Sequence, residues 1–436
     1  MKMKKFLCVL LVFEIFAAAL AASCAAPKKQ PADTTTEPPP PQEETTKEEP
    51  PPKTEPEATQ PGAEKTPKPS IIGSTFLAKD RYIIAGTAPE HAIITIQGAL
   101  SPVETRVIDG LFVAEVFLER QNTEDVALYV YAKSAGKETS DPTVIAIDKD
   151  DKRDTKPVYV GKKNHLHYEY TVDDYLGINL FSEKELSDMR RGAQKLQKQL
   201  QDAGLKTELV IFIAPNHATI YPETMPDFLA EKKVGQDSRA KQMLEAFEGS
   251  GIKVIFPYEA LLREKGDNLL YFLADTHWNE LGAYFGYFEL FGYIGEKFPD
   301  AAPLPQSELD IYETTMYGGD IISNMLFFDS YSYTSTTTAA RIKSPKAAQT
   351  ELVGDPGTGY QVWKNESKPD LPTIAMYRDS FSVAMLGFMA ESSGKLVVNS
   401  MWDFDIDMAQ LKELNPDYLI IEKVERETRS FSVLFR

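Results

Sequence analysis

The sequence predicts an α/β domain with a mainly parallel sheet and flanking helices, preceded by a small all-β sandwich. Two observations support this fold class. After residue 150, short apolar runs alternate with longer helix-favouring stretches, an order typical of a parallel sheet covered on both faces. Between residues 70 and 150, short β-favouring runs are instead separated by turn residues.

The α/β part contains candidate strands interleaved with candidate helices. Its expected strands are residues 209–214, 253–256, 373–377, 396–399 and 418–421, and its expected helices are residues 183–203, 238–248, 280–291, 381–391 and 407–413. The run 209–214 is short and entirely apolar, which suits a buried strand. In open sheets of this kind, reactive residues gather beyond the carboxyl ends of the strands, and we expect the site there.

The β-rich segment has strand candidates near residues 92–96, 111–116 and 126–131, with a turn at Asp109-Gly110. Its turn Gly86-Thr87-Ala88-Pro89, followed by a β-favouring run, resembles the Ig-like modules of bacterial surface proteins. Such a module would serve as a structural spacer or as a glycan-binding unit, and the sequence leaves both open.

The N-terminus has the layout of an export signal, with lysines at positions 2, 4 and 5, an apolar run from 6 to 22 and small residues before Cys24. Residues 21–24, Ala-Ala-Ser-Cys, resemble a bacterial lipobox, with Leu20 one place earlier than expected. This predicts that residues 1–23 are a lipoprotein signal peptide and that Cys24 is lipidated. The protein would then lie outside the cytoplasm, anchored to the bacterial cell membrane. Ordinary secretion and an uncleaved anchor are the alternatives.

Low-complexity sequence follows, because 13 of the 29 prolines fall between residues 27 and 69 among Glu, Thr and Lys. Such a composition cannot form a core, so residues 24–69 are predicted to be a disordered tether. The remaining domains are then the sandwich at 70–150 and the α/β domain at 151–436. The formal charge of -18 disfavours nucleic acid as a partner. Both cysteines, at 8 and 24, precede the folded part, which excludes a thiol nucleophile there.

The candidate general base is His277, in the sequence Asp275-Thr276-His277-Trp278. In an extended segment, residues i and i+2 point to the same side, so Asp275 can approach the imidazole and fix its tautomer. The same spacing also occurs by chance and in metal sites.

The candidate nucleophile is Ser380, which follows the expected strand 373–377 and opens an apolar helix. At a strand-to-helix turn, backbone N–H groups are free to stabilise an oxyanion. The alternative is that Asp379 or Ser380 only caps the helix.

Sequence segments around these residues resemble the alginate O-acetyltransferase-like branch of the SGNH hydrolases, with relatives named for a D-H-H-W motif. The resemblance extends from residue 158 to 436 and rests on the ordered segments Ala214 to Pro222, Asp275 to Trp278, Gly319-Asp320-Ile321, Asp379-Ser380-Phe381 and Asn415 to Arg426. It implies an SGNH-hydrolase-like fold in which Ser380 is the nucleophile, His277 the base and Asp275 its orienter.

The resemblance also implies a function. An acyl group would pass to Ser380 and then to a hydroxyl of a cell-surface polysaccharide, or to water in an esterase. A multi-pass membrane acyltransferase would supply the acyl group. The alternative is a non-catalytic glycan-binding or envelope-assembly module with the same fold. No cofactor and no metal are expected.

Several residues leave two interpretations open. Arg378 stands where the family more often has Gly, and it would either restrict the turn or help to hold an oxyanion. His217 stands where relatives often have Lys. Asn216 would donate to an oxyanion or shape a turn, and Trp278 would offer a face to a sugar or pack in the core.

Two further motifs are expected to play no part in the chemistry. His165 and His167 lack a nearby third metal ligand, so we expect them to alternate along an exposed strand. Gly319 and Asp320 are expected to end a loop near the site rather than to act in catalysis.

Overall fold

The computed structural model describes residues 64–77, 80–118, 126–148, 153, 155–355, 359–400 and 406–435. The predicted signal peptide, the lipidation site Cys24 and most of the predicted tether lie outside these residues. Lys65–Arg436 folds as one unit. Within the described part of the chain, no helix is both long and apolar enough to cross a membrane.

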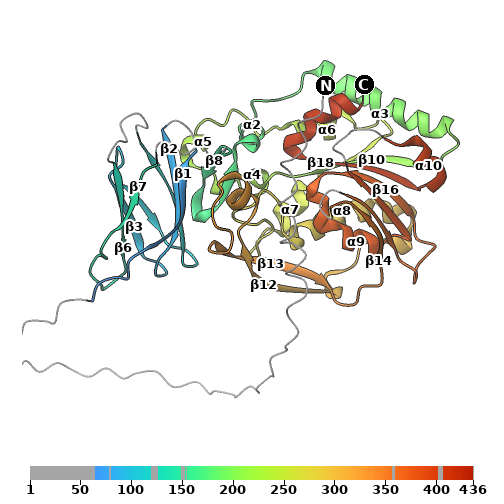
Figure 1. The fold of residues 1–436 in the computed structure, drawn as a ribbon. Coiled ribbons are helices and arrows are strands. Elements are labelled where there is room, and N and C mark those ends of the chain that lie inside the picture. Colours follow the sequence, from blue (N-terminus) through green and yellow to red (C-terminus); the bar gives the residue numbers. More distant parts are fainter. Residues whose placement is uncertain are drawn as a thin grey trace, which may run out of the picture. The chain divides into compact units, whose positions relative to one another are not determined.

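A central sheet organises the α/β part (Figure 1). Its strands, in spatial order, are β11 (Lys253–Ile255), β10 (Glu208–Ala214), β18 (Tyr418–Val424), β16 (Thr373–Arg378), β17 (Lys395–Ser400), β15 (Tyr360–Lys364) and β14 (Ala348–Val353). The strands from β11 to β17 pair in parallel, which confirms the predicted mainly parallel sheet. Strands β15 and β14 extend it as an antiparallel edge. The sequence did not indicate β14 because every residue of this strand is exposed and no apolar run marks it.

Helices cover both faces of the sheet, and its central strands β10 and β18 are therefore buried on both sides. In Figure 1, α8 (Glu280–Lys297) and α9 (Leu386–Glu391) lie on one face, and α3 (Glu183–Asp202) and α6 (Arg239–Ala246) lie on the other. The second face also carries α10 (Met408–Leu414) and α11 (Phe431–Leu434). The N-terminus of α3 is fixed by a capping box between Ser182 and Glu185.

One expected helix begins differently from the prediction. The segment predicted as a helix at 381–391 starts as the 3-10 helix η8 (Ser380–Met385) and becomes α-helical only in α9. The tighter first part matters because it contains the candidate nucleophile.

Shorter elements complete the α/β part. An antiparallel ribbon joins β12 (Leu309–Tyr317) to β13 (Thr334–Ile342), and a second small ribbon joins β8 (Val158–Val160) to β9 (Leu166–Tyr168). Short helices are α2 (Val172–Leu176), α4 (His217–Ile220), α5 (Asp227–Ala230), α7 (Tyr258–Glu264) and the π-helical turn η7 (Ile321–Met325).

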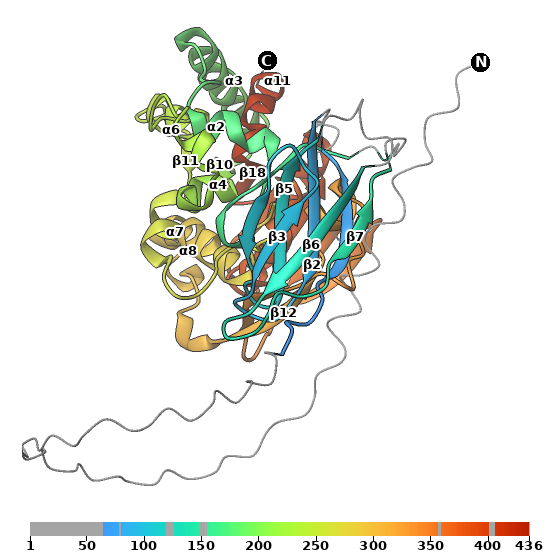
Figure 2. The same ribbon diagram turned by 90° about the vertical axis from the view of Figure 1, so that its left-hand side faces the viewer.

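The described strands between residues 70 and 146 form two antiparallel sheets, in agreement with the predicted all-β sandwich. One sheet contains β1 (Ser70–Phe76), β2 (Arg81–Thr87) and β5 (Leu111–Phe117); the other contains β4 (Val103–Arg106), β3 (Ile93–Gln97), β6 (Ala127–Lys133) and β7 (Thr143–Ala146). Figure 2 shows β3, β6 and β7 side by side. Ile94, Phe112 and Val130 are fully buried in the cluster that the two sheets share. The Ig-like assignment and the predicted domain limits stay predictions.

Candidate active site

The candidate nucleophile, base and carboxylate meet beyond the carboxyl end of β16. Ser380 Oγ lies 2.7 Å from His277 Nε2, and His277 Nδ1 lies 2.7 Å from Asp275 Oδ1. The carboxylate is therefore on the far side of the imidazole from the hydroxyl. A hydrogen-bonded relay of this order allows the ring to accept a proton from Ser380 while Asp275 fixes its tautomer.

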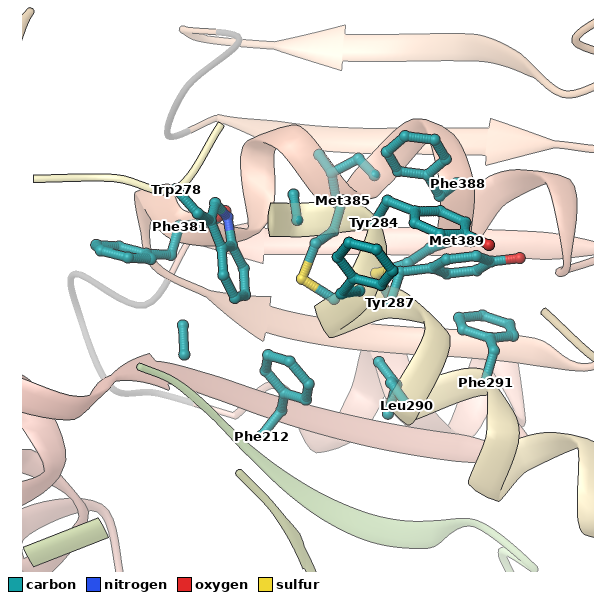
Figure 3. Packing of buried hydrophobic residues seen from close by; sticks show 14 of the residues in the cluster. Phe212, Trp278, Tyr284, Tyr287, Leu290, Phe291, Phe381, Met385, Phe388 and Met389 are labelled. Atoms are coloured by element: carbon teal, nitrogen blue, oxygen red, sulfur yellow. The ribbon is translucent and has the colours of Figure 1, made fainter. Parts of the chain in front are cut away.

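Core packing joins the two segments that carry these residues, which lie about 100 positions apart. Trp278, next to the base, donates its indole N–H to the Phe381 carbonyl oxygen at 2.8 Å. Figure 3 shows the two side chains next to one another, at the edge of the core that Phe212 and Met385 help to fill. The ring of Phe381 also lies against His277, with centroids 4.7 Å apart. Burial of these aromatic rings thus determines where base and hydroxyl meet.

Hydrogen bonds connect the turn that presents Ser380 to β18. The side chain of Asp379 accepts hydrogen bonds from the backbone N–H groups of Phe381 (2.9 Å) and Val424 (2.8 Å). Glu422 accepts one from the backbone N–H of Asp379 (3.0 Å) and one from the hydroxyl of Ser382 (2.6 Å). Asp379 is therefore the helix cap, which leaves the Ser380 hydroxyl available to His277.

The charges around His277 stabilise the protonated form of its imidazole. Burial by itself would lower the pKa of His277, but the charge and the hydrogen bond of Asp275 outweigh it and raise that pKa above 6.5. Burial would raise the pKa of Asp275, but its interactions with His277 hold it below its usual value. The pair is suited to carry a positive charge on the ring during proton transfer.

A second carboxylate lies beside the first. Asp320 Oδ2 is 3.6 Å from His277 Nδ1, and the backbone N–H of Asp320 donates to Asp275 Oδ2 at 2.7 Å. Asp275, His277 and Asp320 are spaced closely enough to share a metal ion. However, Asp275 already accepts N–H groups at both oxygens, and Thr276 donates to both oxygens of Asp320. These contacts favour a hydrogen-bonded relay over a metal site.

The sequence of the α/β part is similar to a known family. Residues 158–358 match the family model described as SGNH hydrolase-like domain, acetyltransferase AlgX. The matched residues, just under half of the chain, are therefore similar to an AlgX-type SGNH hydrolase-like domain. The match confirms the resemblance that the motifs predicted, and it relates the chain to acetyltransferases of the SGNH-like family. It includes Asp275 and His277 but ends before Ser380, so it gives no independent support for the nucleophile.

Several solved structures are similar to this chain. PatB1 of Bacillus cereus is 14% identical with a TM-score of 0.48, and the similarity covers 64% of this chain and 99% of PatB1. A DHHW family protein from Eubacterium siraeum is 13% identical with a TM-score of 0.45, covering 70% of this chain and 94% of that protein. AlgX of Pseudomonas aeruginosa is 18% identical with a TM-score of 0.41, covering 62% of each. No curated protein matched the chain.

Two candidate substrate-binding residues are buried. Trp278 is only 1% exposed, so its ring packs in the core and offers no face to a sugar. Arg378 is also 1% exposed, and its Nη1 contacts the backbone oxygen of Asp379 at 3.3 Å. Burial lowers the pKa of Arg378, and the carboxylate of Glu422 opposes that shift. Of the two interpretations of Arg378, these contacts with the backbone of the turn favour the one in which it restricts the turn.

Asn216 is directed into a different network. Its backbone N–H donates to Glu425 at 3.0 Å, and its side-chain amide donates to Asp174 at 3.3 Å. Asp174 in turn pairs with Arg239 at 3.0 Å. The described contacts therefore place Asn216 in a turn-forming role at the end of β10 rather than next to Ser380.

The expectation for His165 and His167 was wrong. Both are buried, because β9, which contains His167, and the residue before it, His165, pack inside the domain instead of along its surface. A third histidine is close by, since His165 Nδ1 lies 2.8 Å from His217 Nε2. Burial lowers the pKa of His165 to about 4 and that of His167 to about 3, so the cluster is neutral. Among the described residues, only Asp275, His277 and Asp320 are close enough to one another to share an ion.

Sequence analysis missed Arg426 as a site residue. Its guanidinium lies over the ring of Phe381, 5.2 Å from the centroid, and 5.9 Å from the ring of Tyr168. Its Nη1 is buried and has no hydrogen-bond partner among the described residues. Two signals in the sequence could have indicated it: it ends the family-like segment Asn415 to Arg426, and it follows a strand closely, where a parallel sheet presents its functional residues.

Proposed function

We propose that this protein is an extracytoplasmic enzyme that transfers acetyl groups to hydroxyls of a cell-surface polysaccharide, with Ser380, His277 and Asp275 as its triad. The observation that supports this best is the continuous relay from Ser380 Oγ through His277 to Asp275, with 2.7 Å at each step. The family match to an acetyltransferase supports the reaction class.

In the first half-reaction, Ser380 Oγ attacks the carbonyl carbon of an acetyl ester and its proton passes to His277 Nε2. The resulting tetrahedral intermediate collapses, and His277 returns the proton to the departing alcohol. The acetyl group is then an ester of Ser380. In the second half-reaction, an acceptor hydroxyl attacks this ester, His277 takes the hydroxyl proton, and that proton is returned to Ser380 Oγ. With water as the acceptor, the same steps amount to hydrolysis.

The negative oxygen of each intermediate needs hydrogen-bond donors. Ser380 is the first residue of η8, where the helix leaves backbone N–H groups without intrahelical partners. We assign the N–H of Ser380 as one donor to this oxygen.

The setting of the enzyme follows from the N-terminal sequence. A lipid on Cys24 would hold it at the bacterial cell membrane, and the tether at 24–69 would let the folded part reach the polysaccharide. The acetyl donor would come from a multi-pass membrane acyltransferase. Loss of fatty-acid labelling in a Cys24→Ala variant would support the anchor, whereas equal labelling of both forms would exclude it.

The test of the reaction is covalent modification of Ser380. The protein is incubated with an aryl acetate or a sulfonyl fluoride, and the intact mass is measured beside that of Ser380→Ala. We expect one adduct on Ser380, hydrolysis of the aryl acetate and, with a polysaccharide present, transfer of the acetyl group to it. Wild-type protein that gains no more mass than Ser380→Ala, yet still binds glycan, would favour the non-catalytic glycan-binding alternative.

A further inference from the structure

The loop before η7 lies directly against the segment that carries the base. Gly319 has φ +119°, and a Cβ at this position would be 2.3 Å from the carbonyl oxygen of Ala274. A residue with a side chain would have to move the two segments apart. The glycine therefore allows the next residue, Asp320, to contact the backbone and side chains around His277.

Asp320 contacts three consecutive residues of that segment. Its backbone N–H donates to Asp275 Oδ2 at 2.7 Å. Its carboxylate accepts the backbone N–H of Thr276 at 2.7 Å and also the Thr276 hydroxyl. Its Oδ2 lies 3.6 Å from His277 Nδ1, the nitrogen that Asp275 already engages. One residue therefore supports the orienting carboxylate and adds a second negative charge beside the ring.

That charge matters when the ring is positive. During proton transfer from Ser380, the imidazole becomes an imidazolium, and a carboxylate within about 4–6 Å favours the charged form. Asp320 is only 21% exposed, so water screens this interaction weakly. Burial, followed by the charge of Asp275, raises the pKa of Asp320 to about 6, so near pH 7 the carboxylate is mainly ionised.

Other charged or titratable groups also face this pair. Arg426 acts on His277 in the opposite direction and lowers its pKa. Tyr168, on β9, interacts with both Asp320 and Arg426. Asp275 is the remaining carboxylate. Of these groups, the two carboxylates favour the protonated ring.

We propose that Asp320 is a positioning residue of the same reaction, which holds Asp275 and His277 in their relay geometry and stabilises the imidazolium with its charge. This inference rests on the proposed function. It extends the site to a second carboxylate that comes from the loop between β12 and β13.

The experiment measures the rate at which a sulfonyl fluoride modifies Ser380 between pH 5 and 9, by intact mass, so that neither acceptor nor donor is needed. Wild type, Asp320→Asn and Asp320→Glu are compared. Asp329→Asn is the matched control, because Asp329 lies in the same loop but bonds locally, to the backbone N–H of Tyr331 at 3.1 Å. Thermal unfolding verifies that each variant is folded, and Asp320→Ser replaces Asp320→Asn if the amide prevents folding.

We expect Asp320→Asn to lower the pH-independent rate of Ser380 modification roughly tenfold. We also expect the pH at which this rate falls off on the acidic side to decrease by roughly one unit, because the His277 ring loses a negative neighbour and its pKa falls. Asp320→Glu should keep this pH near its wild-type value, and Asp329→Asn should match wild type throughout.

An unchanged rate and acidic pH dependence in Asp320→Asn would overturn the inference. A lower maximal rate with an unchanged acidic pH dependence would also overturn it, since that would indicate a structural role only. The same holds if a chelator abolishes the modification of Ser380 and added Zn²⁺ restores it. If wild-type protein is not modified above Ser380→Ala, the proposed function itself fails.

Discussion

Asp275→Asn is the substitution for which the structure gives the sharpest expectation. Asp275 is 5% exposed and accepts N–H groups from His277 Nδ1 (2.7 Å), the His277 backbone (2.8 Å) and the Asp320 backbone (2.7 Å). An asparagine has only one acceptor oxygen. If that oxygen faces His277, the amide NH₂ meets the N–H of Asp320. If it faces Asp320, the NH₂ meets His277 Nδ1 and forces the proton onto Nε2, which can then no longer accept the proton of Ser380.

Either orientation has a cost that can be estimated. The misplaced donor destabilises the fold by about 1–3 kcal/mol, the usual penalty for an unsatisfied buried polar group. The wrong tautomer and the lost charge should lower kcat by about 10⁴-fold, which corresponds to about 5 kcal/mol of transition-state stabilisation. The assay is aryl acetate hydrolysis together with urea unfolding. A folded variant that retains more than about one tenth of the wild-type rate would refute the assignment of Asp275.

Three further predictions follow from the same geometry. Because the pKa of His277 is raised and the base must be neutral, kcat/KM should fall as the pH drops through a value above 6.5, and a half-maximum below pH 6 would contradict this. Gly319→Ala should strain the backbone by about 1–3 kcal/mol and reduce kcat, because its Cβ meets the Ala274 oxygen; a crystal structure with both segments unmoved would argue against it. Trp278→Phe removes the 2.8 Å hydrogen bond to the Phe381 carbonyl and should lower the free energy of unfolding by about 1 kcal/mol, measured in urea; an unchanged midpoint would contradict this.

Much of the central architecture could be predicted because local sequence patterns determine it. The apolar run at 209–214 became β10, and the polar helix-favouring stretch at 183–203 became α3, with limits within one residue of those expected. The relay residues were also recognisable, since Ser, His and Asp occur in few motifs of this order and only five histidines exist in the chain. Strand β14 was not recognisable, because an exposed edge strand has no apolar pattern.

The amino-acid sequence by itself predicted the candidate nucleophile and base and determined the alternation of strands and helices, whereas the N-terminal signal stays a prediction. Only the tertiary structure decided which side chains share an environment. It placed Asp320 against His277 and Arg426 over Phe381, buried Arg378 and Trp278, and gathered His165, His167 and His217 into one neutral cluster. The physical reason is that strand identity depends on neighbouring residues in the chain, whereas charge, burial and pKa at the site depend on segments that are distant in sequence and meet only when the sheet has formed.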